Sequence, residues 1–154
     1  MAQLTTESIL AELPVWRHAL TLGLVDKPAF LNWMQQHQHV LSNSAEMRQL
    51  VAQSERLANP ALLALMAKVP VDSAEQSWWP ALKHCAFQAL QEGRVEAQTL
   101  TSYLYNLALE DEVPAYDKQD LYQLELEFDS LLQGFASEDE VTQQMLSFLQ
   151  RGAP

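Results

Sequence analysis

The chain has 154 residues, of which 48% are hydrophobic and 19% are charged, as is typical of one globular domain. Twenty acidic residues against nine basic ones give a formal charge of -11, which disfavours binding to nucleic acid or to an anionic membrane surface. The sequence holds no apolar run long enough to span a membrane, its start lacks the features of a signal peptide, and its lone cysteine fits a reducing compartment, so we expect a cytoplasmic protein.

Glycines and prolines stand where helices should begin or end, and no segment alternates apolar and polar residues as a strand would, so the sequence predicts an all-α fold. In the first half of the chain each predicted helix starts at a capping residue or an early proline. These starts are Thr6, Pro14, Asp26, Ser44 and Asn59. Gly23 ends the second helix, and the apolar stripe of the third extends to Leu41.

The second half of the chain follows the same pattern. Ser73 followed by Gln76 resembles a capping box that opens one turn. The longer helices are then expected over residues 80–92, 95–113, 117–133 and 137–150, the last one opened by a capping box at Ser137 and Glu140. In total we expect eight or nine helices in a single domain, residues 1–154, packed as a compact bundle or as an irregular helical array.

Motifs for catalysis, metal binding or phosphate binding are missing from the sequence. His37 and His39 are two residues apart, which separates them by about 200° on a helix, and no Glu-x-x-His pair occurs. The chain has no Gly-x-Ser-x-Gly elbow, and its glycines are too far apart to form a phosphate loop. Cys85 lies on an apolar stripe, where we expect it to be buried and inert. The sequence therefore predicts no enzyme, no metal and no cofactor.

The negative charge is concentrated in the last two fifths of the chain. Residues 1–94 hold eight acidic and seven basic residues, whereas residues 95–150 hold twelve acidic residues and one basic residue, Lys118. The acidic residues 138–140 suit the start of a helix, but Glu110, Asp111 and Glu112 fall at a helix end, where the macrodipole opposes negative charge. That second triplet has no evident local explanation, and solubility alone does not require such segregation.

All four tyrosines lie in this acidic segment, and two of them belong to a short repeat. Residues 104–110 and 121–127 both read Leu-Tyr-amide-Leu-x-Leu-Glu. In each copy the tyrosine and the leucine four residues later share a face away from the main apolar stripe. Either both helices are covered on two sides, or these pairs are exposed as an anchor within an acidic rim.

We therefore place a candidate partner-binding surface in this segment. Its residues are Tyr105, Leu109, Glu110, Asp111, Glu112, Tyr116, Tyr122, Glu125, Leu126 and Asp129. Tyrosines supply contact area and carboxylates steer a partner of opposite charge, so the expected partner is another protein with a basic surface. The oligomeric state is left open.

The favoured hypothesis is a non-catalytic neutraliser that covers a basic toxin or nucleic-acid enzyme, by analogy with the surface character of bacterial immunity proteins. A variant is nucleic-acid mimicry, in which carboxylates imitate phosphates. The alternative is a helical adaptor or assembly chaperone that holds a client peptide in a groove. It would use Trp78 or Trp79. Adjacent side chains diverge by about 100°, so either one of the two is a surface anchor or both are buried under the preceding loop.

Overall fold

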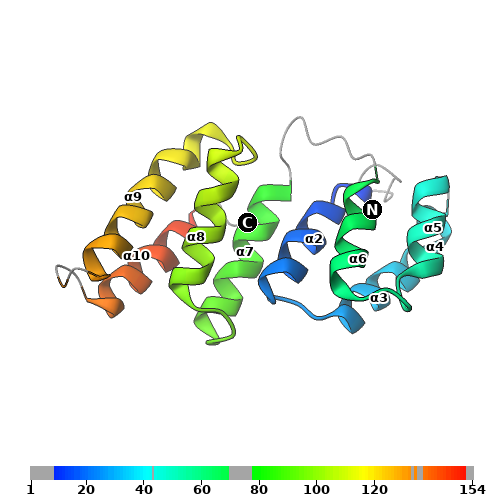
Figure 1. Ribbon diagram of the computed structural model, residues 1–154, viewed down its shortest axis with the longest axis horizontal. Helices are drawn as coiled ribbons and strands as arrows, with labels where there is room; N and C mark the ends of the chain where they lie inside the picture. The colour runs from blue at the N-terminus through cyan, green and yellow to red at the C-terminus, as the bar shows by residue number, and fades with distance from the viewer. Residues whose placement is uncertain (1–8, 43, 70–77, 133, 135–136, 152–154) are drawn as a thin grey trace, which may run out of the picture. The chain divides into compact units, whose positions relative to one another are not determined.

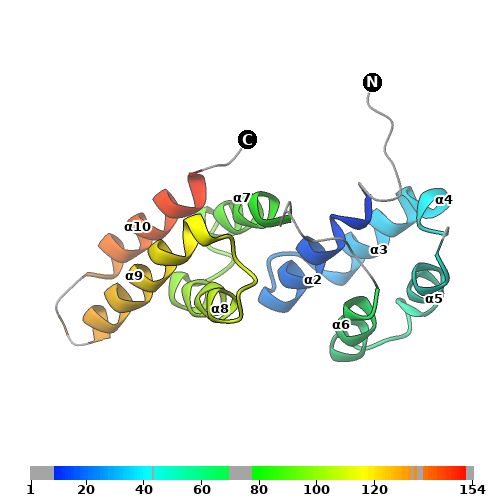
Figure 2. The same cartoon turned by 90° about the horizontal axis from the view of Figure 1, so that it is seen from above.

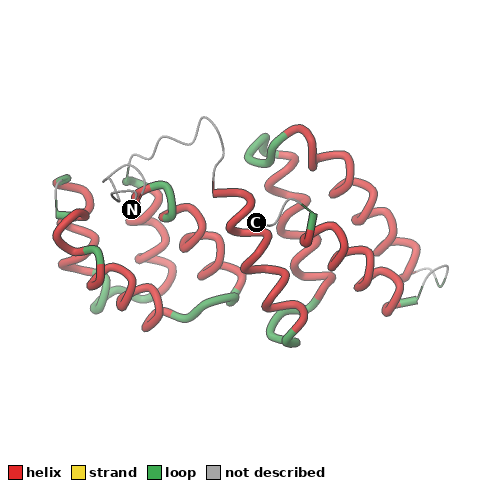
Figure 3. Tube along the Cα trace, turned by 180° about the vertical axis from the view of Figure 1, so that it is seen from behind, coloured by secondary structure: helices red, strands yellow, loops and turns green. Residues whose placement is uncertain are grey.

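The computed structural model describes residues 9–42, 44–69, 78–132, 134 and 137–151, and these residues form helices and loops without strands (Figures 1 and 3). The all-α prediction is confirmed, and the described residues hold nine named helices. They are α2 (Leu13–Leu22), α3 (Lys27–Gln36), α4 (Gln38–Leu41), α5 (Ala45–Gln53), α6 (Asn59–Ala67), α7 (Trp78–Gln91), α8 (Ala97–Leu109), α9 (Ala115–Leu132) and α10 (Glu138–Gln150). The predicted cap at Thr6 and the capping box at residues 73–76 lie outside the described residues.

Three predicted N-caps are confirmed by their hydrogen bonds. Asp26 accepts from the backbone N–H of Ala29 at 3.0 Å, and Ser44 accepts from that of Met47 at 3.1 Å. The hydroxyl of Ser137 accepts from the third residue of α10 at 3.2 Å. Each bond satisfies a backbone donor that has no partner within its own helix.

Some predicted boundaries are wrong. The stripe from Asp26 to Leu41 is divided between α3 and α4, because His37 has φ -113° and ψ 16° and therefore leaves the helical region. Helix α7 begins at Trp78, two residues before Pro80, and α9 begins at Ala115 rather than Asp117. A proline is accommodated in the first turn because the N–H it lacks has no helical partner there.

Residue contacts divide the chain into two compact units, Met1–Trp78 and Trp79–Pro154. In the first unit α2 packs against α6, and α4, α5 and α6 contact one another in chain order (Figure 1). The rings of Trp16, Phe30 and Trp33 stack or tilt against one another with centroids 5.6 to 5.8 Å apart. In the second unit α9 packs against both α8 and α10, and α10 also contacts α8 (Figure 2).

The two units share one helix-turn-helix element, repeated at an offset of 70 residues. Its turn contains Gly23 in the first unit and Gly93 in the second, with φ of 74° and 75°. The positions of Ala19 and Phe30 correspond to those of Ala89 and Leu100, and all four side chains are buried. The segments α2–α3 and α7–α8 are therefore the same local structure built from two different sequences.

The end of α8 repeats this turn with an aspartate in the position of the glycine. Asp111 has φ 60°, and the backbone N–H groups of Asp111 and Glu112 donate to the carbonyls of Ala108 and Leu107 at 3.2 and 3.0 Å. This is the Schellman pattern, whose left-handed residue is normally glycine, since a Cβ is unfavourable there. Asp111 therefore occupies a strained conformation at an exposed position.

We expect Asp111→Gly to raise the melting temperature of the chain, because glycine adopts this conformation without strain. The matched control is Gly93→Ala, which places a Cβ at φ 75° and should lower stability by about 1 kcal/mol. Thermal unfolding followed by circular dichroism measures both. A drop in melting temperature for Asp111→Gly would show that the aspartate side chain stabilises the turn by more than its strain costs.

Candidate protein-binding surface

Helices α8 and α9 present the predicted tyrosine and leucine pairs on one continuous surface. The rings of Tyr105 and Tyr122 meet edge to face, with centroids 5.7 Å apart and planes at 80°. A hydrogen bond also links Ser102 of α8 to Glu125 of α9, so residue numbers rise in opposite directions and the two helices are antiparallel. We define the tyrosine face as the following seven residues of these two helices: Ser102, Tyr105, Leu109, Tyr122, Glu125, Leu126 and Asp129.

The exposure of the tyrosine face decides between the two readings of the repeat. Leu109 is 57% exposed and Leu126 is 59% exposed, whereas Tyr105 and Tyr122 are half-buried against each other. The interpretation that both helices are covered on two sides is therefore wrong for the leucines. Each tyrosine ring is partly covered by the other, and the rest of its surface is exposed.

Glu125 of the tyrosine face has a partly buried carboxylate. Its Oε2 atom is covered and has no hydrogen-bond partner among the described residues. Burial and the nearby carboxylate of Asp129 raise the pKa of Glu125 above its usual range, and the hydrogen bond with Ser102 opposes this shift. Ionisation of Glu125 is therefore less favourable in the folded chain than in the unfolded chain.

The acidic triplet lies at the end of α8, next to Leu109. Glu110 and Asp111 are exposed and Glu112 is half-buried. Asp111 forms an ion pair with Lys118 in the first turns of α9, and the hydrogen bond and charge of that lysine lower the pKa of Asp111. The sequence analysis found no local explanation for this triplet, but the structure gives a partial one. Asp111 forms the turn at the end of α8 and pairs with Lys118, the single lysine of this segment.

Tyr116 belongs to a different surface from the tyrosine face. Six residues separate it from Tyr122, which places the two about 120° apart around α9. Tyr116 is 71% exposed, and it lines a cavity of about 170 Å³ together with Trp79, Lys83 and Asp117. The structure therefore brings eight of the ten predicted positions onto the tyrosine face or the adjoining loop end at Leu109–Asp111, while Tyr116 faces another direction.

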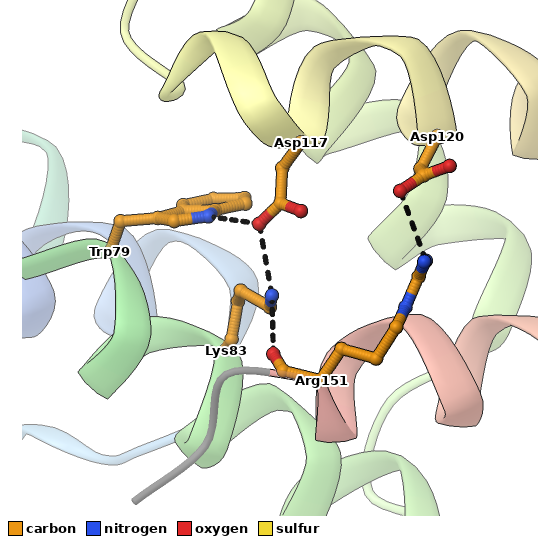
Figure 4. A network of polar contacts seen from close by, with 5 residues as sticks. All are labelled: Trp79, Lys83, Asp117, Asp120 and Arg151. Atoms are coloured by element: carbon orange, nitrogen blue, oxygen red, sulfur yellow. Dashed lines mark hydrogen bonds and ion pairs between the residues drawn. The ribbon is translucent and has the colours of Figure 1, made fainter.

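A buried polar network beside this cavity was not predicted (Figure 4). The ammonium of Lys83 donates to Asp117 Oδ2 at 2.9 Å and to the backbone carbonyl of Arg151 at 2.7 Å. The indole N–H of Trp79 donates to the same carboxylate oxygen at 2.7 Å. Lys83 is 3% exposed and Asp117 is 6% exposed, so the pair is withdrawn from water.

Aromatic rings complete the surroundings of the Lys83 ammonium. Its nitrogen lies 4.8 Å from the ring centroid of Phe148 and 6.0 Å from that of Trp79. The two hydrogen bonds and the ring faces together compensate a buried cation. The network joins α7, α9 and the end of α10, which is a structural role. Sequence spacing could not reveal it, because its hydrogen-bonded pairs are up to 68 positions apart.

The tryptophan pair lacks the exposed side chain that the adaptor hypothesis would use. Trp78 is 6% exposed and Trp79 is 0% exposed, so of the two alternatives both tryptophans are buried and neither is a surface anchor. The two side chains do diverge, but both directions are covered. Trp78 stacks on His18 of the first unit at 5.0 Å, and Trp79 turns to Asp117 and Phe148 of the second.

Two further titratable side chains are altered by burial. Burial and the charge of Arg17 lower the pKa of His18 to about 4, so this histidine is neutral at physiological pH. Cys85 is half-buried, so the prediction that it is fully buried is wrong. Burial still raises the pKa of its thiol, which keeps the reactive thiolate scarce.

The part of the chain that the structure describes offers neither a cluster of metal ligands nor a helix that could cross a membrane. Within residues 9–42, 44–69, 78–132, 134 and 137–151, no group of three or more His, Cys, Asp or Glu residues is placed to hold a metal ion. Over the same ranges, each helix is too short or too polar to cross a bilayer. Comparison with known proteins finds no matching family model, no similar curated protein and no similar solved structure.

We expect Glu125→Gln to stabilise the chain at neutral pH. The raised pKa means that ionisation is less favourable in the folded state, so the penalty is present at pH 7 and disappears as pH falls below the carboxyl's unfolded value. Urea unfolding at pH 7 and pH 4 measures this gain and its loss. Glu127→Gln, on the same helix, is the control, and an equal effect of both variants would contradict a special environment at Glu125.

Replacing Lys83 by methionine should destabilise the chain by about 3 to 5 kcal/mol, because Asp117 would remain buried without its cation. Arg94→Met removes an ion pair with Glu92 whose side chains are 45% and 61% exposed, and it should cost less than about 1 kcal/mol. Equilibrium unfolding in urea compares the two variants. Similar losses would mean that the Lys83 network contributes no more than a surface ion pair.

Proposed function

We propose that this chain is a non-catalytic protein-binding module of the immunity type, which neutralises a basic toxin or nucleic-acid enzyme in the cytoplasm by covering its basic surface. One observation carries the proposal. Among the described residues, the exposed large hydrophobic side chains are Leu109, Tyr116 and Leu126, and all three lie in the acidic segment 95–150. Apolar contact area and a single sign of charge therefore occur together.

Charge and contact have separate roles in such a complex. Exposed carboxylates at Glu110, Asp111 and Asp129 attract a basic protein over about one Debye length and so raise the association rate. The leucines and tyrosines then lose water-exposed apolar surface in the complex, which slows dissociation. Nucleic-acid mimicry is the variant in which the carboxylates alone provide recognition.

The alternative function, an adaptor that holds a client peptide, is favoured by one feature of the first unit. Helices α3 and α5 line a hollow of about 450 Å³ whose apolar walls include Leu31, Met34 and Val51. A peptide held there would bind through apolar contact, and its affinity would change little with salt. Steep dependence of the association rate on ionic strength distinguishes the neutraliser from the adaptor.

Reversing the charge of Glu112, Glu125 and Asp129 to lysine should slow association with the native partner by at least about tenfold at low salt and flatten its salt dependence. Tyr122→Ala should mainly hasten dissociation, because it removes contact area rather than charge. The partner is obtained by affinity capture from the native cell, and rates are then measured with purified proteins over a range of ionic strength.

The control for this experiment is the reversal of Glu46, Glu55 and Glu92, which changes the net charge by the same amount at positions outside the acidic segment. If both triple variants associate equally slowly, only total charge matters. If the triple variant of the acidic segment associates as fast as the wild type, the acidity is a solvated face and the proposed function fails.

A further inference from the structure

The tyrosine face bears two carboxylates without a cation from the chain itself. Within the described residues the ion pairs of the second unit involve Asp117, Asp111, Asp120 and Glu92, and neither Glu125 nor Asp129 takes part in one. The Oε2 atom of Glu125 also lacks a hydrogen-bond donor. That covered oxygen is out of reach of a partner, but the exposed carboxylate of Asp129 lies one turn away and the rest of the Glu125 side chain is half-buried, so this pair remains accessible to a cation from outside.

Apolar contacts flank these charges in a regular geometry. Leu109 lies one turn beyond Tyr105 on α8, and Leu126 lies one turn beyond Tyr122 on α9. Since the helices are antiparallel, the two leucines lie on opposite sides of the tyrosine pair, about 12 Å apart along the helix axes. This axial distance matches two turns of a helix that lies along α8 and α9, with apolar residues seven or eight positions apart.

Charge complementarity selects the occupant of this face. A second copy of the chain would bring two proteins of charge -11 together, and the acidic segment would be repelled in the same way by an anionic lipid surface. A cationic segment is attracted instead. Arginine suits the site better than lysine, because its planar guanidinium has five donors that can bridge the adjacent carboxylates of Glu125 and Asp129 and can stack on a tyrosine ring.

We propose that the tyrosine face binds an amphipathic helix of the partner, with an arginine against Glu125 and Asp129 and with apolar residues two turns apart against Leu109 and Leu126. This inference rests on the proposed function, since it specifies which part of a basic protein the face would recognise. It assigns the tyrosine pair as the centre of the contact and Glu125 as the residue that discriminates between cations.

Two synthetic helical peptides test the inference. Both have leucines seven positions apart, and they differ only in carrying arginine or lysine at the basic positions. Isothermal titration at about 0.15 M salt, near physiological ionic strength, gives their affinities. The wild-type chain should bind the arginine peptide about tenfold more tightly than the lysine peptide. Glu125→Gln should remove that preference, whereas Glu127→Gln should retain it.

Glu125→Gln is a clean probe because it is expected to fold at least as stably as the wild type, which urea unfolding checks. Equal affinity for the two peptides, equal effects of Glu125→Gln and Glu127→Gln, or binding of neither peptide would overturn the inference. Those outcomes leave the proposed function intact, because it is tested separately by triple charge reversal with the whole partner. Arginine preference without any effect of that reversal would instead overturn the proposed function.

Discussion

The packing of the second unit depends on the contacts that the buried ammonium group of Lys83 makes with α9 and with the end of α10. This ammonium, on a side chain of α7, donates to the Asp117 carboxylate of α9 and to the backbone carbonyl of Arg151 at the end of α10. It also lies against the ring of Phe148. Arg151 also forms an ion pair with Asp120 at 3.1 Å, so the end of α10 is joined to α9 directly through Asp120 and indirectly through Lys83. Because α9 packs between α8 and α10, this network sets the position of the helix that carries half of the tyrosine face.

Local rules were sufficient for much of the fold. Caps at Asp26, Ser44 and Ser137 follow from a short polar side chain whose oxygen reaches a backbone N–H three residues later, and such contacts are encoded within one turn. The break at His37 was missed because the apolar stripe continues across it. The spacing of apolar residues does not reveal that the φ and ψ angles of a single residue leave the helical region. The 70-residue repeat was also missed, since the turn and two buried positions on either side of it carry the similarity.

The part of the candidate surface that lies within a single helix could be predicted from helical periodicity. Spacing of four residues placed Tyr105 with Leu109 and Tyr122 with Leu126, and the exposed leucines confirm that these pairs lie off the core. The contact between the two tyrosines and the link from Ser102 to Glu125 required the register of α8 against α9, which a single sequence does not contain. Tyr116 was grouped with the others by its position along the chain, but its direction around α9 separates it from them.

The division of the chain between Trp78 and Trp79 also separates its chromophores. Trp16, Trp33 and Trp78 belong to the first unit, whereas Trp79 and all four tyrosines belong to the second. Tyrosine absorbance and emission therefore originate in the acidic half alone, and helix α7 offers two adjacent indoles, Trp78 and Trp79, as acceptors of excitation energy. The chain carries an intrinsic optical label on the same helices as its acidic surface.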